Sequence, residues 1–185
     1  MNETNTDKKQ RPKRSKQVIV SVVFVSVGIV LIFIVIALSV LIARWTESKQ
    51  LSACQANLNK LSKAVWKYSV YNEQKLPTAE KWCDLVSRYL IASPDKVLRC
   101  PAAEGGRCNY AFNENVSEMK LSDVPSDVVL IFESEPNWNS AGGPELLAGD
   151  VHKDGEKAPG CNILFGAGWP EFVKKDDLDT LRWEP

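Results

Sequence analysis

The only histidine of the chain, His152, lies in an acidic loop, and this loop is the first segment whose residues could do chemistry. Asp150, Asp154 and Glu156 surround the histidine. Hard cations such as calcium prefer clustered oxygen ligands, so Asp150, His152 and Asp154 are the candidate metal ligands. Their spacing matches no EF-hand loop, and solvated acidic loops are common. We therefore predict neither a metal nor another cofactor.

A catalytic site would need a reactive side chain with an oriented partner. Glu133 and Glu135 would share one face of a strand, because side chains alternate along a strand. Pro136 follows directly and indicates that the strand ends there, so we expect two solvated carboxylates. The chain contains no G-x-S-x-G and no H-E-x-x-H motif. The sequence predicts a protein that is not an enzyme.

A long apolar segment, residues 18–43, contains no charged residue and exceeds the roughly 20 residues that a membrane-spanning helix needs. No Gly or Pro occurs from Ile29 to Leu76, so we predict one helix that continues beyond the membrane. The segment is too long for the apolar core of a cleaved signal peptide, for which a site near Ala37 to Ser39 would be the alternative.

Charges next to this segment predict its orientation. Residues 1–17 carry six basic and two acidic side chains, so the positive-inside rule places this tail in the cytoplasm and residues 44–185 outside. The whole chain has no net charge, which leaves the exported part acidic and argues against nucleic-acid binding. The predicted organisation is a basic tail (1–17), a single span (18–43) and one exported domain (44–185).

Beyond the span, apolar residues recur at spacings of three and four, which predicts an amphipathic helix. A second helix of about a dozen residues should follow Thr78, an expected N-cap. Short strands are predicted at 97–100, 110–112 and 128–133, and a hairpin at 162–165 and 171–173 around Gly166 to Gly168. These elements predict an α+β fold in which the helix stripe packs on a small, mostly antiparallel sheet. The stripe consists of Leu51, Cys54, Leu58, Leu61, Val65 and Tyr68.

The five cysteines all lie in the part predicted to be exported, where disulfides form. No C-x-x-C motif and no paired zinc knuckles occur, so a thioredoxin-type or zinc-finger site is not expected. We predict two disulfides and leave Cys54 free as a small buried thiol on the helix stripe. Three pairings remain open, and we favour Cys83–Cys100 with Cys108–Cys161. The predicted disulfide residues are Cys83, Cys100, Cys108 and Cys161.

Several stretches resemble one family of bacterial proteins. They are CQANL at 54–58, CP at 100–101, CNYAFN at 108–113, VLIFE at 129–133, His152, and GCNILF at 160–165. In order and spacing they are similar to type IV pilin-like, or pseudopilin-like, proteins, and most closely to a prepilin-like group with a C-terminal DG-H hairpin motif. The resemblance covers most of residues 50–173 and implies a pilin-like fold in the bacterial inner membrane.

Two departures from this family limit what the resemblance implies. The apolar segment opens with Val18-Ile19-Val20 and lacks the Phe-Thr-Leu-x-Glu that follows the prepilin peptidase cleavage site, so we expect no cleavage. Residues 167–170 replace the usual Asp-Gly-His-Val, which removes any ligand role of that Asp and His.

Two functions remain open at this stage. The first is a membrane-anchored structural or assembly protein that binds similar pilin-like subunits or a secretion apparatus. The alternative is a monomeric anchored binding module whose C-terminal loops hold a ligand such as a glycan or calcium. The lipid bilayer is a partner in both cases.

Overall fold

A computed structural model describes residues 14–103, 105–153 and 159–185, apart from the side chains of residues 14–18, 20 and 153. The chain forms two compact units, Met1–Ala43 and Arg44–Pro185, and we call the second the globular unit. Residues 1–13 of the predicted cytoplasmic tail and the candidate ligand Asp154 lie outside the described residues.

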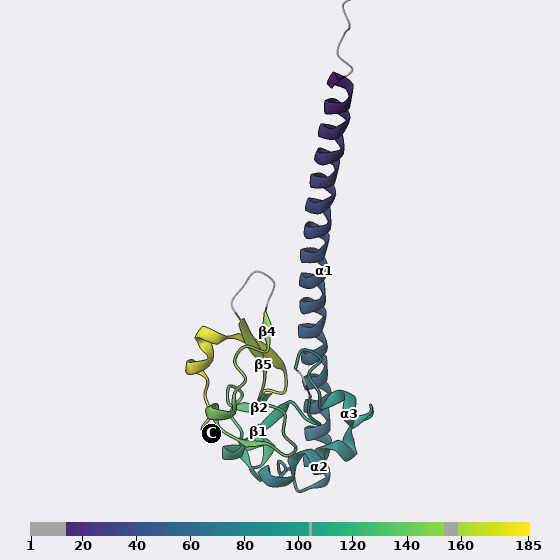
Figure 1. The fold of residues 1–185 in the computed structure, drawn as a ribbon. Helices are drawn as coiled ribbons and strands as arrows, with labels where there is room; N and C mark the ends of the chain where they lie inside the picture. Colours follow the sequence, from purple (N-terminus) through teal and green to yellow (C-terminus); the bar gives the residue numbers. More distant parts are fainter. Residues whose placement is uncertain (1–13, 104, 154–158) are drawn as a thin grey trace, which may run out of the picture. The chain divides into compact units, whose positions relative to one another are not determined.

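Helix α1, Arg14–Tyr71, is a single helix of 58 residues (Figure 1), so the predicted continuous helix is confirmed. Its most apolar stretch has a mean hydropathy of 3.2 and buries none of its residues. The large apolar side chains described between Ile19 and Ile42 are exposed. By length and composition this part of α1 is able to cross a membrane.

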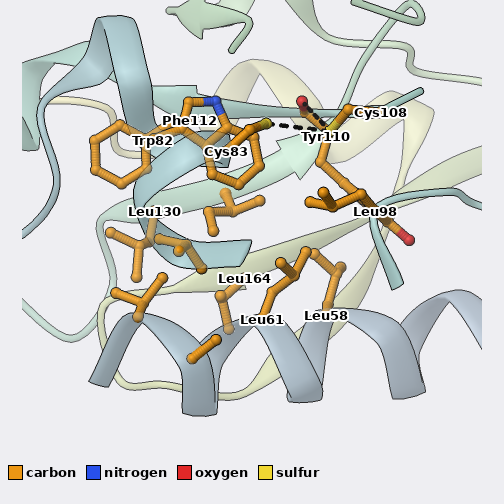
Figure 2. Packing of buried hydrophobic residues seen from close by; sticks show 14 of the residues in the cluster. Leu58, Leu61, Trp82, Cys83, Leu98, Cys108, Tyr110, Phe112, Leu130 and Leu164 are labelled. Atoms are coloured by element: carbon orange, nitrogen blue, oxygen red, sulfur yellow. Dashed lines mark hydrogen bonds between the residues drawn. The ribbon is translucent and has the colours of Figure 1, made fainter. Parts of the chain in front are cut away.

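The C-terminal part of α1 carries the core of the globular unit. Cys54, Leu58, Leu61 and Val65 are buried, whereas Lys63 on another face is exposed. The stripe packs on residues of the sheet, including Leu130 and Leu164, and Figure 2 shows Leu58 and Leu61 directed at them from the helix. The predicted burial against the sheet is confirmed for these four stripe residues, whereas Leu51 and Tyr68 at the two ends of the stripe are half-buried.

The predicted second helix is present as three short consecutive pieces. They are a 3-10 helix Ala79–Lys81, α2 Trp82–Val86 and a 3-10 helix Ser87–Tyr89. The side chain of Thr78 does not cap this helix. Instead, the hydroxyl of Ser117 accepts a hydrogen bond from the N–H of Ala79 at 3.0 Å, so the N-terminal donor is satisfied by a residue distant in sequence.

The predicted strand at 97–100 is wrong. Pro94 begins a short helix there, α3 Pro94–Val97, and the N–H of Leu98 donates to the Pro94 carbonyl at 2.8 Å. Proline suits the first position of a helix because its φ is already helical and its missing N–H is not needed. Cys100 lies in the turn after α3.

The sheet has six strands in the order β3-β1-β2-β5-β4, with β6 also paired to β5. Pairings are antiparallel except β1 with β3, which is parallel. The α+β class is therefore confirmed, with a mixed rather than purely antiparallel sheet. The strands are β1 Tyr110–Asn113, β2 Val129–Glu133, β3 Ala141–Gly142, β4 His152–Lys153, β5 Pro159–Phe165 and β6 Pro170–Lys174.

Both faces of the central strands are buried. One face lies against α1, and the other holds a smaller cluster that includes Phe132 and Ile163. The C-terminal segment covers this second face, where the rings of Phe132 and Trp183 meet edge to face at 4.9 Å. Burial on both faces explains why β2 is a continuous apolar run rather than an alternating one.

The predicted C-terminal hairpin is confirmed as β5 and β6. Gly168 in its turn has φ of +89°, a conformation that glycine adopts without strain. The hydroxyl of Ser62 on α1 donates to the Gly168 carbonyl at 2.6 Å, which ties the hairpin to the helix. The remaining 3-10 helices are Glu114–Val116, Leu121–Asp123, Pro144–Leu146 and Lys175–Thr180.

Candidate functional site

Four side chains from distant parts of the sequence meet at one buried point of the globular unit, and we call them the Cys–His–Glu cluster. They are Cys54, Cys100, Glu133 and His152, whose sulfur, oxygen and nitrogen atoms all lie within 4.8 Å of one another. Each residue is at most 3% exposed. Ionisable groups are rarely buried to this extent unless they have partners.

Hydrogen bonds from α1 and a disulfide hold the turn that carries Cys100 next to Cys54. Cys54 lies on the buried stripe of α1, and Cys100 lies in the turn after α3. The amide of Asn57, one turn beyond Cys54, donates to the carbonyls of Lys96 and Arg99 at 3.1 and 2.9 Å. The turn is thereby held against the helix, and a disulfide joins Cys54 to Cys100.

Glu133 reaches the cluster as the last residue of β2. Its carboxylate accepts hydrogen bonds from the Asn162 backbone N–H at 2.7 Å and from the Asn162 amide at 3.3 Å. The prediction of two solvated carboxylates is therefore wrong for Glu133, while Glu135 is exposed as expected. The strand does end at Glu133, but Glu133 pairs with Tyr110 of β1 and its carboxylate is held by Asn162 of β5, so this end of the strand is buried.

His152 in β4 contacts two members of the cluster through one nitrogen. Its Nε2 lies 2.9 Å from Oε1 of Glu133 and 3.2 Å from Sγ of Cys100. A catalytic triad uses the two ring nitrogens in opposite directions, one toward the nucleophile and one toward the acid. Here sulfur and carboxylate both contact the same nitrogen, so the cluster does not have the geometry of a catalytic triad.

The cluster borders a small hollow at the surface. This hollow has a volume of about 130 Å³, and His152 forms part of its wall. Two acidic side chains, Glu47 and Asp150, lie in the same wall. The hollow therefore gives a path to His152, and the negative charge of its wall would attract a cation. Its full lining is Glu47, Gln50, Ala102, Asp150, Val151 and His152.

Of the two predicted metal ligands that the structure describes, Asp150 and His152, only His152 belongs to the cluster. Asp150 is exposed, and its carboxylate lies 3.7 Å from the ammonium of Lys175. Asp154 lies outside the described residues. Sequence reasoning thus singled out the histidine but gave it neighbours in sequence, whereas its partners come from α1, the turn after α3 and β2.

The predicted disulfides are wrong. Cys54, expected to be free, is bonded to Cys100, and Cys83, Cys108 and Cys161 are free and buried. The position of Cys54 on the stripe was correct, but the stripe faces the turn that carries Cys100. No local pattern gives this contact, because the two cysteines are 46 residues apart.

Two of the free cysteines lie close together. The sulfur atoms of Cys83 and Cys108 are 3.7 Å apart in the core, and Figure 2 shows this contact between α2 and the segment before β1. Burial raises the pKa of the Cys83 thiol far above its usual value, and the contact with Cys108 raises it further. Burial likewise raises the pKa of Cys161.

A second feature of the globular unit is an exposed apolar patch, which we call the α1 patch. Trp66, Val70, Tyr71 and Ile91 are 58, 41, 76 and 92% exposed. All four line one surface hollow of about 540 Å³, together with Tyr89. The rings of Tyr71 and Tyr89 stack at 6.0 Å. Contiguous exposed apolar side chains of this kind mark interaction sites.

Comparison of the chain with known protein families, with characterised proteins and with solved structures finds no match.

Proposed function

We propose that this chain is a membrane-anchored, pseudopilin-like structural or assembly protein whose globular unit binds a second copy of the chain. In this proposal the protein spans the bacterial inner membrane once, keeps its N-terminus in the cytoplasm, exports residues 44–185 and is not an enzyme. Support comes from α1, because a single helix contains the apolar segment and also forms the core of the globular unit.

The observation that carries the proposal is the α1 patch. Aromatic side chains such as Trp66 and Tyr71 supply much of the binding energy at protein interfaces. Exposure of these aromatic rings to water is unfavourable, and a partner that covers them would remove this cost. Ile91, at 92% exposure, contacts little of its own chain.

Charge complementarity favours a second copy as the partner. Lys67 and Arg88 line the hollow of the α1 patch, and Lys60 and Lys63 line a neighbouring hollow that shares Ile91 with it. The 3-10 helix Lys175–Thr180 offers exposed acidic side chains at Asp176, Asp177 and Asp179. When two different surfaces of the same chain are complementary, copies bind head to tail in a heterologous contact. Repetition of this contact builds rings or filaments.

Cross-linking of the full chain in membranes tests this proposal. Wild type should form dimers and higher species, and Trp66→Ala should reduce their yield severalfold. Trp169→Ala is the matched control, because Trp169 is also exposed, at 57%, but lies outside the α1 patch. A charge reversal, Lys63→Glu with Lys67→Glu, should also weaken assembly.

The reversal Asp176→Lys with Asp177→Lys should restore assembly to the charge-reversed variant if these two surfaces meet. A wild-type chain that remains monomeric in the membrane would overturn the proposal and favour the monomeric binding module. Equal cross-linking of Trp66→Ala and wild type would rule out the α1 patch as the contact.

A further inference from the structure

We propose that the Cys–His–Glu cluster, once its disulfide is reduced, binds one zinc-class divalent cation. The ligands are the sulfur atoms of Cys54 and Cys100, Nε2 of His152 and the carboxylate of Glu133. This inference is independent of the proposed assembly, because the α1 patch and the cluster share no residue.

The atom positions are already close to those of a tetrahedral site. Zinc binds sulfur at about 2.3 Å and nitrogen or oxygen at about 2.0–2.2 Å, which separates neighbouring ligand atoms by roughly 3–4 Å. The Nε2 atom of His152 lies 2.9 Å from Glu133 Oε1 and 3.2 Å from Cys100 Sγ. All four ligand atoms lie within 4.8 Å of one another. Formation of the site requires that the two bonded sulfur atoms separate and that the cation replace the contact between Nε2 of His152 and Glu133.

The donor set selects the class of cation. Thiolate and imidazole ligands suit zinc, and calcium and magnesium prefer sites made of oxygen alone. Four protein ligands close the coordination shell, which is typical of a structural zinc site. Asn162 supplies the outer shell, because its backbone and side-chain N–H groups hold both oxygens of Glu133.

Reduction and metal binding form a balanced sequence. A dithiol reductant gives two electrons and two protons to the Cys54–Cys100 bond, and its own sulfur atoms become a disulfide. The cation then replaces the two thiol protons, which leave to solvent. Nε2 of His152 must be free of its proton to bind the metal, since only an unprotonated ring nitrogen is a ligand.

The hollow beside His152 supplies the entry path. Glu47 and Asp150 in its wall would draw a divalent cation toward the cluster. Once bound, the cation would join α1, the turn after α3, β2 and β4. Metal would therefore replace the cross-link that the disulfide provides in the oxidised protein.

Cobalt titration of the full chain in detergent tests this inference. Protein reduced under nitrogen should bind one Co²⁺ and develop intense tetrahedral d–d bands with a sulfur-to-cobalt charge-transfer band, and equimolar Zn²⁺ should bleach both. The same protein with its disulfide intact should develop neither band. Asn162→Ala should weaken binding about 10–100-fold, as loss of an outer-shell partner does.

Cys100→Ser and Cys83→Ser form a matched pair, because both remove a buried thiol and only Cys100 is a ligand. Cys83→Ser should retain the charge-transfer band and Cys100→Ser should lose it. A reduced wild type without tetrahedral cobalt bands would overturn the inference, as would equal bands in Cys100→Ser. Should Cys100→Ser fail to fold, the comparison of reduced with oxidised wild type decides the question alone.

Discussion

His152 and Glu133 form a buried pair in which Nε2 lies 2.9 Å from Oε1, and their side chains are only 2% and 0% exposed. Burial of a carboxylate is costly unless hydrogen bonds and an opposite charge compensate it. Asn162 supplies the hydrogen bonds, and His152 is the only ionisable nitrogen described in contact with this carboxylate. The pair therefore adds a side-chain link between β4 and β2 to the backbone pairing of β4 with β5.

Removal of His152 should strongly destabilise the globular unit. His152→Ala removes the hydrogen-bond partner of Glu133 Oε1, and a buried polar group left without its partner costs about 1–3 kcal/mol of unfolding free energy. Denaturant unfolding of the full chain in detergent measures this loss. The double variant His152→Ala with Glu133→Gln should recover part of it, because the charge is gone. Glu135→Gln, at an exposed position, should change stability by no more than about 0.5 kcal/mol. Additive losses in the double variant would disprove the coupling.

A second disulfide should form between Cys83 and Cys108 in an oxidising compartment. Their sulfur atoms are 3.7 Å apart, so little movement is required. Because burial keeps the Cys83 thiol protonated, the bond should form during folding rather than by attack on the folded protein. Thiol counting on unfolded, unreduced protein should find one free cysteine, and peptide mapping should place it at Cys161. Three free cysteines would contradict this prediction.

The buried stripe of α1 should tolerate no charge. Leu58→Asp places a carboxylate where the side chain is 0% exposed and should cost several kcal/mol, on the order of 3 or more. The adjacent Asn59→Asp introduces the same charge at an exposed position and should have little effect. Thermal unfolding of both variants in the full chain provides the comparison. Equal melting temperatures would mean that the stripe does not pack on the sheet.

Asp84 should stabilise the protein in a pH-dependent way. Its carboxylate accepts hydrogen bonds from the Asn139 amide at 2.7 Å and the Trp138 indole at 3.0 Å. Both bonds lower the pKa of Asp84 below its usual value, and the bond from Asn139 has the larger effect. A lowered folded-state pKa contributes stability above the unfolded value of about 4, and this is lost as the pH falls through the folded value.

Asp84→Asn should therefore lower the urea midpoint at pH 7 and differ less from wild type below about pH 4. The control Asp95→Asn changes another exposed aspartate and should not alter the pH profile. A difference between Asp84→Asn and wild type that is the same at both pH values would show that the carboxylate charge has no role.

Elements whose signal is local could be predicted from the sequence. The stripe of α1, strand β2 and the hairpin around Gly168 each follow from spacing, β-branched residues or a turn glycine within a few positions. The strand predicted at 97–100 is wrong because Val97 and Leu98 resemble the start of a short strand, whereas Pro94 begins α3 just before them.

The cluster could not be predicted in the same way. Its residues come from four segments, and only their packing brings Cys54 to Cys100 and Glu133 to His152. Glu133 also carried a misleading local signal, since a glutamate before Glu135 and Pro136 suggests an exposed strand end. Buried polar contacts between distant segments produce no periodic pattern in the sequence, so they cannot be predicted from composition or residue spacing.

Native mass spectrometry of the full chain, extracted from membranes in detergent, tests the proposed anchored assembly most directly. The subunit should retain residues 1–17 and the whole apolar segment, and should occur as dimers or larger multiples. A monomeric species, or a subunit that begins within the apolar segment, would contradict the proposal.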